Sequence, residues 1–191
     1  YVGNAINAAG TTSQLAAVLD LVGGRAGWTA NQIDSAVDSL IALGIQSDSA
    51  NNLLIQFARN QLDVADATRL AAVAQDAAGI AQLNSSETLD RMMTAILTSN
   101  TQMLRTIGIN VNATRAQEEY AASIGKTRAQ LTETERIQAM MNAVMAEGEI
   151  IAGTYDTLQQ HVIKRMGSLR RVFYEISVSI GEAFLPSLSN V

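Results

Sequence analysis

Residues 131–148, with the sequence LTETERIQAMMNAVMAEG, contain the best-defined helix start in this chain. Thr132 and Glu135 have the spacing of a capping box, in which the threonine side chain accepts a backbone N–H and the glutamate reaches back to the cap residue. Glu133 and Glu135 also bring negative charge to the positive end of the helix dipole. The stretch therefore predicts an amphipathic helix that starts at Thr132 and buries Ile137, Met140, Met141, Val144 and Met145.

The apolar pattern continues beyond this helix to residue 185. After Gly153, apolar residues recur in steps of three and four over about eight turns, which predicts a long amphipathic helix. The residues of this stripe are Leu158, Val162, Met166, Leu169, Val172, Phe173, Ile176, Ile180, Phe184 and Leu185. Gly148 and Gly153 flank Ile150-Ile151, and they could form a turn that folds the long helix back or a hinge that straightens. Both interpretations of the two glycines stay open.

Upstream of Gly125, short helical patterns alternate with capping and stop signals. We expect helices to start near Thr11-Thr12, Thr29, Ser47, Asp63 or Asp66, Asn84 and Asn112, and to stop near Gly23-Gly24, Gly44, Gly79, Gly108 and Gly125. The helix starting at Asn84 is expected to reach Ile107 without a break. No repeat of fixed period is apparent. The predicted fold is all-α: residues 1–125 form a bundle of short antiparallel helices, and residues 126–191 form a helical hairpin with one long amphipathic helix.

Composition supports a helical core and argues against several functions. Hydrophobic residues make up 48% of the 191 residues, aromatic residues only 4%, and the one proline is Pro186. The chain has no cysteine, which excludes thiol chemistry and disulfides. Its net charge of -5 argues against general nucleic-acid binding, which needs a basic surface. No apolar run approaches the ~18 residues that span a bilayer. Because the chain starts with Tyr1 rather than Met, we expect it to be part of a longer protein.

Three pieces of the C-terminal third resemble a known family when taken together and in order. They are LTETER at 131–136, AVMAEG at 143–148 and IGEAFLP at 180–186. This arrangement is similar to a segment of the tail tape measure proteins of long-tailed bacteriophages and prophages, of the form LTEAEK…A…LNAVLEEG…L…L…IGEAFLPAL. The resemblance covers about residues 131–188, whereas residues 1–125 match only in helical style.

The resemblance implies a structural role in a virion tail. Tape measure proteins lie extended in the tail tube, set its length by their own length, and leave ahead of the genome during ejection. The implied partners are the tail tube, a tail-assembly chaperone and baseplate proteins. The implied locations are the tube lumen and, during assembly, the host cytoplasm.

Basic residues cluster in the predicted long helix. Between Thr157 and Arg171 the charged residues are Lys164, Arg165, Arg170 and Arg171, with no acidic residue among them. This basic patch is a candidate surface for an acidic partner, although a solvated helix face that balances acidic neighbours is the favoured interpretation. The apolar stripe beside it needs a cover, either from the preceding bundle or by self-association, unless it is released when the protein extends.

A different class of function is a helical adaptor domain that binds a partner through the apolar stripe of residues 89–107 or 158–185. The first stripe is rich in methionine, which suits adaptable binding surfaces, but filling of an ordinary core is the preferred interpretation.

The sequence predicts no enzyme, cofactor or metal site. His161, the single histidine, has no ligand-like neighbours, so we expect a surface or interhelical role. The carboxylate pairs Glu118-Glu119, Glu133 with Glu135, and Glu147 with Glu149 have the residue types of a glycosidase site, but helix-end electrostatics accounts for them. The glycines at 23–27 lack the preceding strand of a phosphate-binding loop.

Overall fold

The computed structural model of the chain describes residues 2–158, with side chains from Thr12 onward. Within that range every regular element is a helix and there is no strand, so the all-α prediction is confirmed. The long amphipathic helix predicted after Leu158, with its basic patch, lies outside the described residues. The chain divides into two compact units, Tyr1–Tyr155 and Asp156–Val191, and the fold described below is that of the first.

The first unit consists of eight α-helices and one short 3-10 helix in its described part. Their bounds are α1 Val2–Arg25, α2 Ala30–Ala42, α3 Ser47–Arg59, α4 Val64–Ala81, α5 Ser85–Leu97, α6 Thr101–Thr106, α7 Ala113–Ser123, η1 Arg128–Gln130 and α8 Glu133–Ile151.

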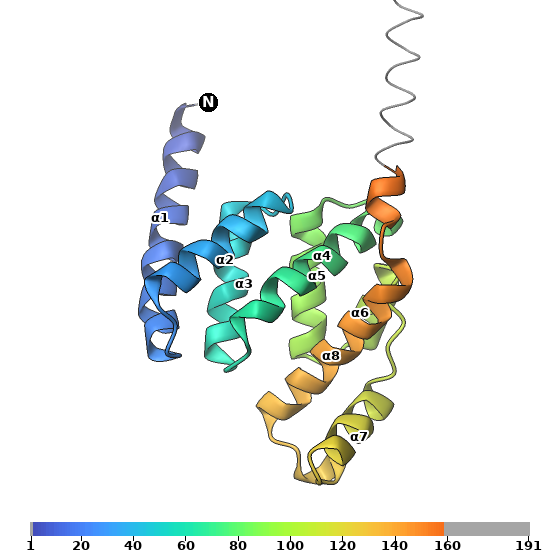
Figure 1. Ribbon diagram of the computed structural model, residues 1–191. Coiled ribbons are helices and arrows are strands. Elements are labelled where there is room, and N and C mark those ends of the chain that lie inside the picture. Colours follow the sequence, from blue (N-terminus) through green and yellow to red (C-terminus); the bar gives the residue numbers. More distant parts are fainter. Residues whose placement is uncertain (1, 159–191) are drawn as a thin grey trace, which may run out of the picture. The chain divides into compact units, whose positions relative to one another are not determined.

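The helices of this unit form two layers. Helices α1, α3 and α5 lie side by side in one layer, and α2, α4 and α8 cross them in the other (Figure 1). Each helix of a layer packs on the next but one along the chain, α1 on α3 and α2 on α4, while consecutive helices contact each other across the layers. Helix α8 packs beside α4 in the second layer, and α7 packs on α8. This arrangement is a stack of antiparallel helix pairs.

One hydrophobic core runs between the layers. Its largest fully buried side chains come from α1, α2, α3, α4, α5, α6 and α8 and from the loop after α6: Leu19, Leu40, Leu54, Phe57, Leu70, Leu89, Met92, Ile96, Leu104, Ile107, Ile109 and Met140. Ala67, Ala71, Ala74 and Ala77 of α4 have no exposed surface, which lets the neighbouring helices approach α4 closely. The core therefore relies on aliphatic side chains and methionine, as the composition suggests.

The first seven α-helices end in the same way. In each, a residue with positive φ follows the helix: Gly27, Gly44, Gln61, Gln82, Ser99, Gly108 and Gly125. The next residue donates its N–H to the carbonyl five residues earlier, at 2.8–3.2 Å, as in Trp28 to Gly23, Ile45 to Leu40 and Leu62 to Phe57. This is the Schellman motif, which satisfies carbonyls that the helix end would leave without a partner.

The same three-residue connection joins the first five helices. A residue with positive φ is followed by an apolar residue and then by the first cap residue of the next helix: Gly27-Trp28-Thr29, Gly44-Ile45-Gln46, Gln61-Leu62-Asp63 and Gln82-Leu83-Asn84. The apolar residue packs into or against the core in every case. Gly27, Gly44 and Gln61 lie at equal intervals of 17 residues. The sequence hides this regularity because two of the four left-handed positions are glutamine.

Several predicted helix boundaries are wrong. Helix α1 runs through Thr11-Thr12 and Gly23-Gly24. Gly23 is a site of close packing and not a stop signal, since a Cβ there would lie 2.8 Å from Ile33 Cδ1. Helix α4 passes through Gly79 to Ala81. The single helix predicted from Asn84 to Ile107 is broken at residues 98–100, where the Asn100 side chain accepts the N–H of Met103 and starts α6. Short polar side chains compete with helical backbone bonds in this way.

The domain boundary predicted near Gly125 does not coincide with the division in the structure. Helix α8 lies beyond Gly125, but it contacts α4, α5 and α7 and belongs to the same compact unit. Its buried residues Ile137, Met140 and Val144 join the core formed by the preceding helices. A glycine with φ of 70° at position 125 thus marks a helix end rather than a domain end.

The left-handed positions predict opposite effects for two exchanges. Gln61 and Gly44 occupy equivalent exposed sites, with φ of 55° and 79°. A residue with a Cβ pays about 1–2 kcal/mol in this conformation, so Gln61→Gly should raise the free energy of unfolding and Gly44→Gln should lower it, each by about 1 kcal/mol. Urea titration with an unchanged m-value measures both. If both exchanges raised, or both lowered, the free energy of unfolding, the left-handed conformation assigned to these two positions would be contradicted.

Candidate functional site

The stretch that carries the family resemblance begins with a well-anchored helix cap. Leu131 is buried, with 5% of its surface exposed. The Thr132 hydroxyl accepts the N–H of Glu135 at 3.3 Å, and Glu135 Oε2 accepts the N–H of Thr132 at 2.8 Å. The predicted capping box is confirmed. Its two bonds satisfy backbone donors that would otherwise be left without a partner at the start of α8.

Glu135 also ties α8 to the end of α7. Its Oε1 forms a salt bridge with the ammonium of Lys126, the residue that closes the α7 Schellman motif. The Lys126 hydrogen bond and the Thr132 amide hold the pKa of the Glu135 carboxyl below its ordinary value. One carboxylate thus caps α8 and fixes the α7–α8 corner, which is a structural role.

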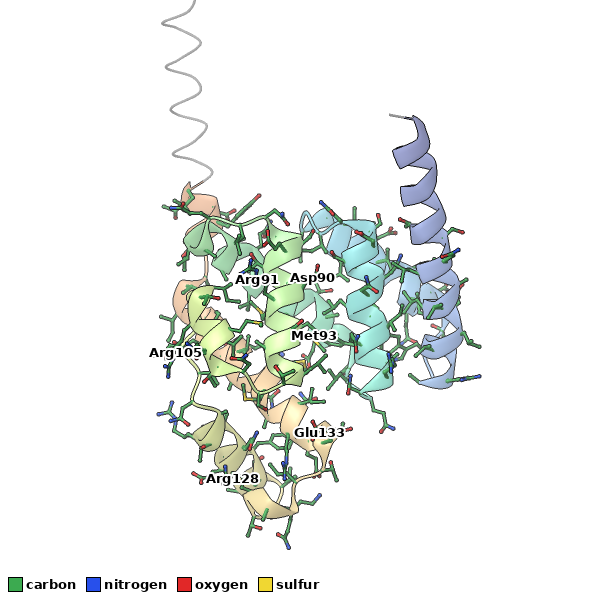
Figure 2. All side chains as sticks on the ribbon, turned by 180° about the vertical axis from the view of Figure 1, so that it is seen from behind. Asp90, Arg91, Met93, Arg105, Arg128 and Glu133 are labelled. Atoms are coloured by element: carbon green, nitrogen blue, oxygen red, sulfur yellow. The ribbon has the colours of Figure 1, made fainter. Side chains whose placement is uncertain are left out.

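The predicted buried face of α8 is also confirmed. Ile137, Met140, Met141, Val144 and Met145 are all buried. Glu133, which Figure 2 shows at the start of α8, is exposed to solvent.

Gly148 is buried inside α8, whereas the sequence suggested that it could form part of a turn or hinge. A Cβ at this position would lie 2.4 Å from Cγ2 and 2.7 Å from Cγ1 of Val73 on α4. Only glycine lets the two helix backbones approach this closely. Gly148 therefore sets the spacing between α4 and α8. A shallow groove of about 220 Å³ follows the same seam and ends at Asp76 and Ala152.

The second candidate hinge residue, Gly153, lies in a turn directly after α8, with φ of 80°. Its N–H donates to Asp76 Oδ2 at 3.2 Å, and the N–H of Tyr155 donates to Asp76 Oδ1 at 3.0 Å. Asp76 belongs to α4 and lies 77 residues before Gly153 and 79 residues before Tyr155 in the sequence, so these hydrogen bonds join distant parts of the chain. No local pattern in the sequence marks Asp76, because it caps a turn that is distant along the chain.

The candidate basic patch of Lys164, Arg165, Arg170 and Arg171 lies outside the described residues, as does His161. The described part of the chain thus contributes the helix cap, the α4–α8 seam and the turn at Gly153 to the site.

The methionine-rich stripe of residues 89–107 belongs to the core. Leu89, Met92, Ile96, Leu104 and Ile107 have essentially no exposed surface. Met93, labelled in Figure 2, is buried as well, with 5% exposed. This stripe is therefore not available as a surface for a partner protein.

Two polar contacts join α3 to α5. Ser49 Oγ donates to Asp90 Oδ2 at 3.1 Å, and Ser86 Oγ accepts the N–H of Gln46 at 2.8 Å. Figure 2 shows Asp90 on α5. Partial burial raises the pKa of the Asp90 carboxyl, the Ser49 bond opposes this shift, and the charge of Asp48 adds to it. These groups stabilise the layer and form no enclosed pocket.

The predicted carboxylate pairs lie on the surface or beside open grooves in the described region. Glu119 forms an exposed salt bridge with Arg115 at 3.5 Å, and Glu118 is exposed. Glu119 and Glu147 line an open groove of about 160 Å³ between α7 and α8. Among the described residues, no three histidine, aspartate or glutamate side chains gather as metal ligands do. No helix within residues 2–158 is long and apolar enough to cross a membrane.

Comparisons with known proteins identify no relative. No family model, no curated protein and no solved structure matches the chain.

The Glu135 salt bridge predicts a pH effect. A carboxyl whose pKa is lowered in the folded state adds stability at pH values above its ordinary pKa, and this stability is lost as the pH falls through the lowered value. Glu135→Gln keeps an oxygen for the Thr132 amide but loses the charge. The decrease in melting temperature between pH 7 and pH 3 should therefore be smaller for Glu135→Gln than for the wild type. Glu133→Gln is the control, because it removes a charge from the same helix end without breaking the Lys126 salt bridge, and it should change that decrease less than Glu135→Gln does.

The α4–α8 spacing predicts a destabilising glycine exchange. Gly148→Ala forces a methyl group into Val73, and overpacking of this kind costs about 1–3 kcal/mol, more than the gain in helix propensity. Val73→Ala in the same chain should restore much of the loss. Gly24→Ala is the control, because a Cβ there meets no atom within 4 Å; it should stabilise α1 slightly. Urea unfolding of the four proteins tests the seam, and a neutral Gly148→Ala would contradict it.

Proposed function

We propose that this chain is a helical segment of a tail tape measure protein of a long-tailed phage or prophage, with a structural and assembly role and without catalysis. The observation that carries the proposal is the ordered resemblance of residues 131–148 and 180–186 to the family segment. Its place would be the tube lumen of the virion tail, reached through the host cytoplasm, with tail tube, chaperone and baseplate proteins as partners.

The described residues support this proposal through the roles that the matching positions have. Leu131 is an anchor in the core, Thr132 and Glu135 form the cap, and Gly148 is the point of close helix approach. These are roles in folding and packing, which agree with a structural segment. The all-helical composition of the described part also agrees with a family that is mostly helical.

The parent gene provides the first test. The proposal expects a reading frame of many hundreds of codons, located between tail tube and baseplate genes. A complete reading frame close to 191 codons would contradict it, because a continuous helix of that length spans only about 290 Å at ~1.5 Å per residue.

Tail length provides the second test. An in-frame deletion of 70 helical codons from the parent gene should shorten the tails by about 105 Å if the deleted part is extended in the tube, at ~1.5 Å per residue. Electron micrographs of purified particles measure this length. The length-neutral exchange Glu133→Gln is the control and should leave tails unchanged. Tails of normal length after a stop codon early in the parent gene would exclude the proposed role.

A further inference from the structure

The end of α8 differs from the ends of the seven α-helices before it. Those helices close with a local Schellman motif, whose hydrogen bonds join residues five positions apart. After α8, Ala152 is extended, with φ of -55° and ψ of 135°, and the next residue, Gly153, is left-handed. The N–H groups of Gly153 and Tyr155 then donate to the carboxylate of Asp76 on another helix. The interruption thus involves a tertiary contact.

Asp76 acts here as a helix cap supplied from outside. Helical structure resumes at Thr154, and Asp76 accepts N–H groups at its first turn. A carboxylate at this place satisfies orphan donors and interacts favourably with the positive end of the helix dipole. Thr154 Oγ1 also donates to the carbonyl of Ile151 at 2.6 Å, which satisfies one acceptor at the end of α8.

A continuous helix is the natural competitor of this turn. If Ala152 and Gly153 took helical angles, the N–H groups that now reach Asp76 would bond to carbonyls four residues earlier, within the same helix. Residues 149–156 contain no proline that would break such a helix. The carboxylate of Asp76 would then lose both amide donors. The balance between the two states therefore depends on the Asp76 contacts and on the freedom of Gly153 to adopt positive φ.

We propose that Asp76 is a conformational latch: its carboxylate holds the chain interrupted at Ala152-Gly153, and its release lets α8 continue through these residues as one helix. The packing of Gly148 against Val73 fixes the preceding turn of α8 on α4, so the change is confined to the residues that follow. This inference does not require the proposed function, because it concerns only groups within residues 73–155.

Backbone chemical shifts test the latch in the 191-residue chain. The ¹³Cα shift of Ala152 distinguishes an extended from a helical residue. In the wild type it should be in the extended range, and in Asp76→Ala it should move to the helical range with the amide of Gly153 still protected from exchange. Asp76→Asn keeps one acceptor oxygen and should give an intermediate value. Asp66→Ala removes another carboxylate of α4 and should have no effect at Ala152.

Two results with Asp76→Ala would overturn the proposal. One is an unchanged extended shift at Ala152. The other is a random-coil shift with loss of amide protection, which would mean that the turn frays instead of becoming helix. The methyl signals of Met141 and Val144, buried in α8, report whether the variant is folded.

Gly153→Ala disfavours the interrupted state by making positive φ costly, whereas Asp76→Ala removes the contacts that hold it. Gly153→Ala therefore tests the latch even if Asp76→Ala fails to fold. A Cβ at Gly153 meets no atom within 4 Å, so the exchange acts through φ alone. It should move the Ala152 shift toward the helical range while Asp76 is still present. An extended Ala152 in this variant would overturn the latch.

Discussion

The backbone hydrogen bond that closes each of the first seven α-helices is the constraint on which the fold depends. It joins an N–H to a carbonyl five residues earlier and requires one residue with positive φ between them. Because the residue after the left-handed one is usually apolar and packs on the core, the bond both stops a helix and directs the chain into the next one. Repetition of this connection places successive helices alternately in the two layers (Figure 1).

The packing of the hydrophobic core agrees with this two-layer arrangement of helices. Helices that turn back at these connections present one stripe to each neighbour, and small residues on α4 allow close approach from both layers. Gly148 extends this principle to α8, where even a methyl group would collide with Val73. Close packing between α4 and α8, rather than the local sequence around Gly125, is the reason that α8 belongs to the first compact unit.

The residues that match the family segment have structural roles, and this bears on the kind of function they support. Leu131, Thr132 and Glu135 start a helix and fix a corner, and Gly148 fixes a distance. None of them lines an enclosed pocket in the described part of the chain. A role in assembly is compatible with such a set.

The sequence by itself determined what depends on neighbours along the chain. Capping residues such as Thr29, Asp63, Asn84, Asn112 and Thr132 start helices as predicted, and the apolar face of α8 is buried as predicted, because caps and helical periodicity are local. Only the tertiary structure decided that Gln61, Gln82 and Ser99 adopt positive φ, that Gly23 and Gly148 are sites of close packing, and that Asp76 caps a turn 77 residues away. The packing sites and the Asp76 cap depend on groups distant in sequence, and the cost of positive φ at Gln61 and Gln82 is balanced by core contacts of the apolar residues that follow them.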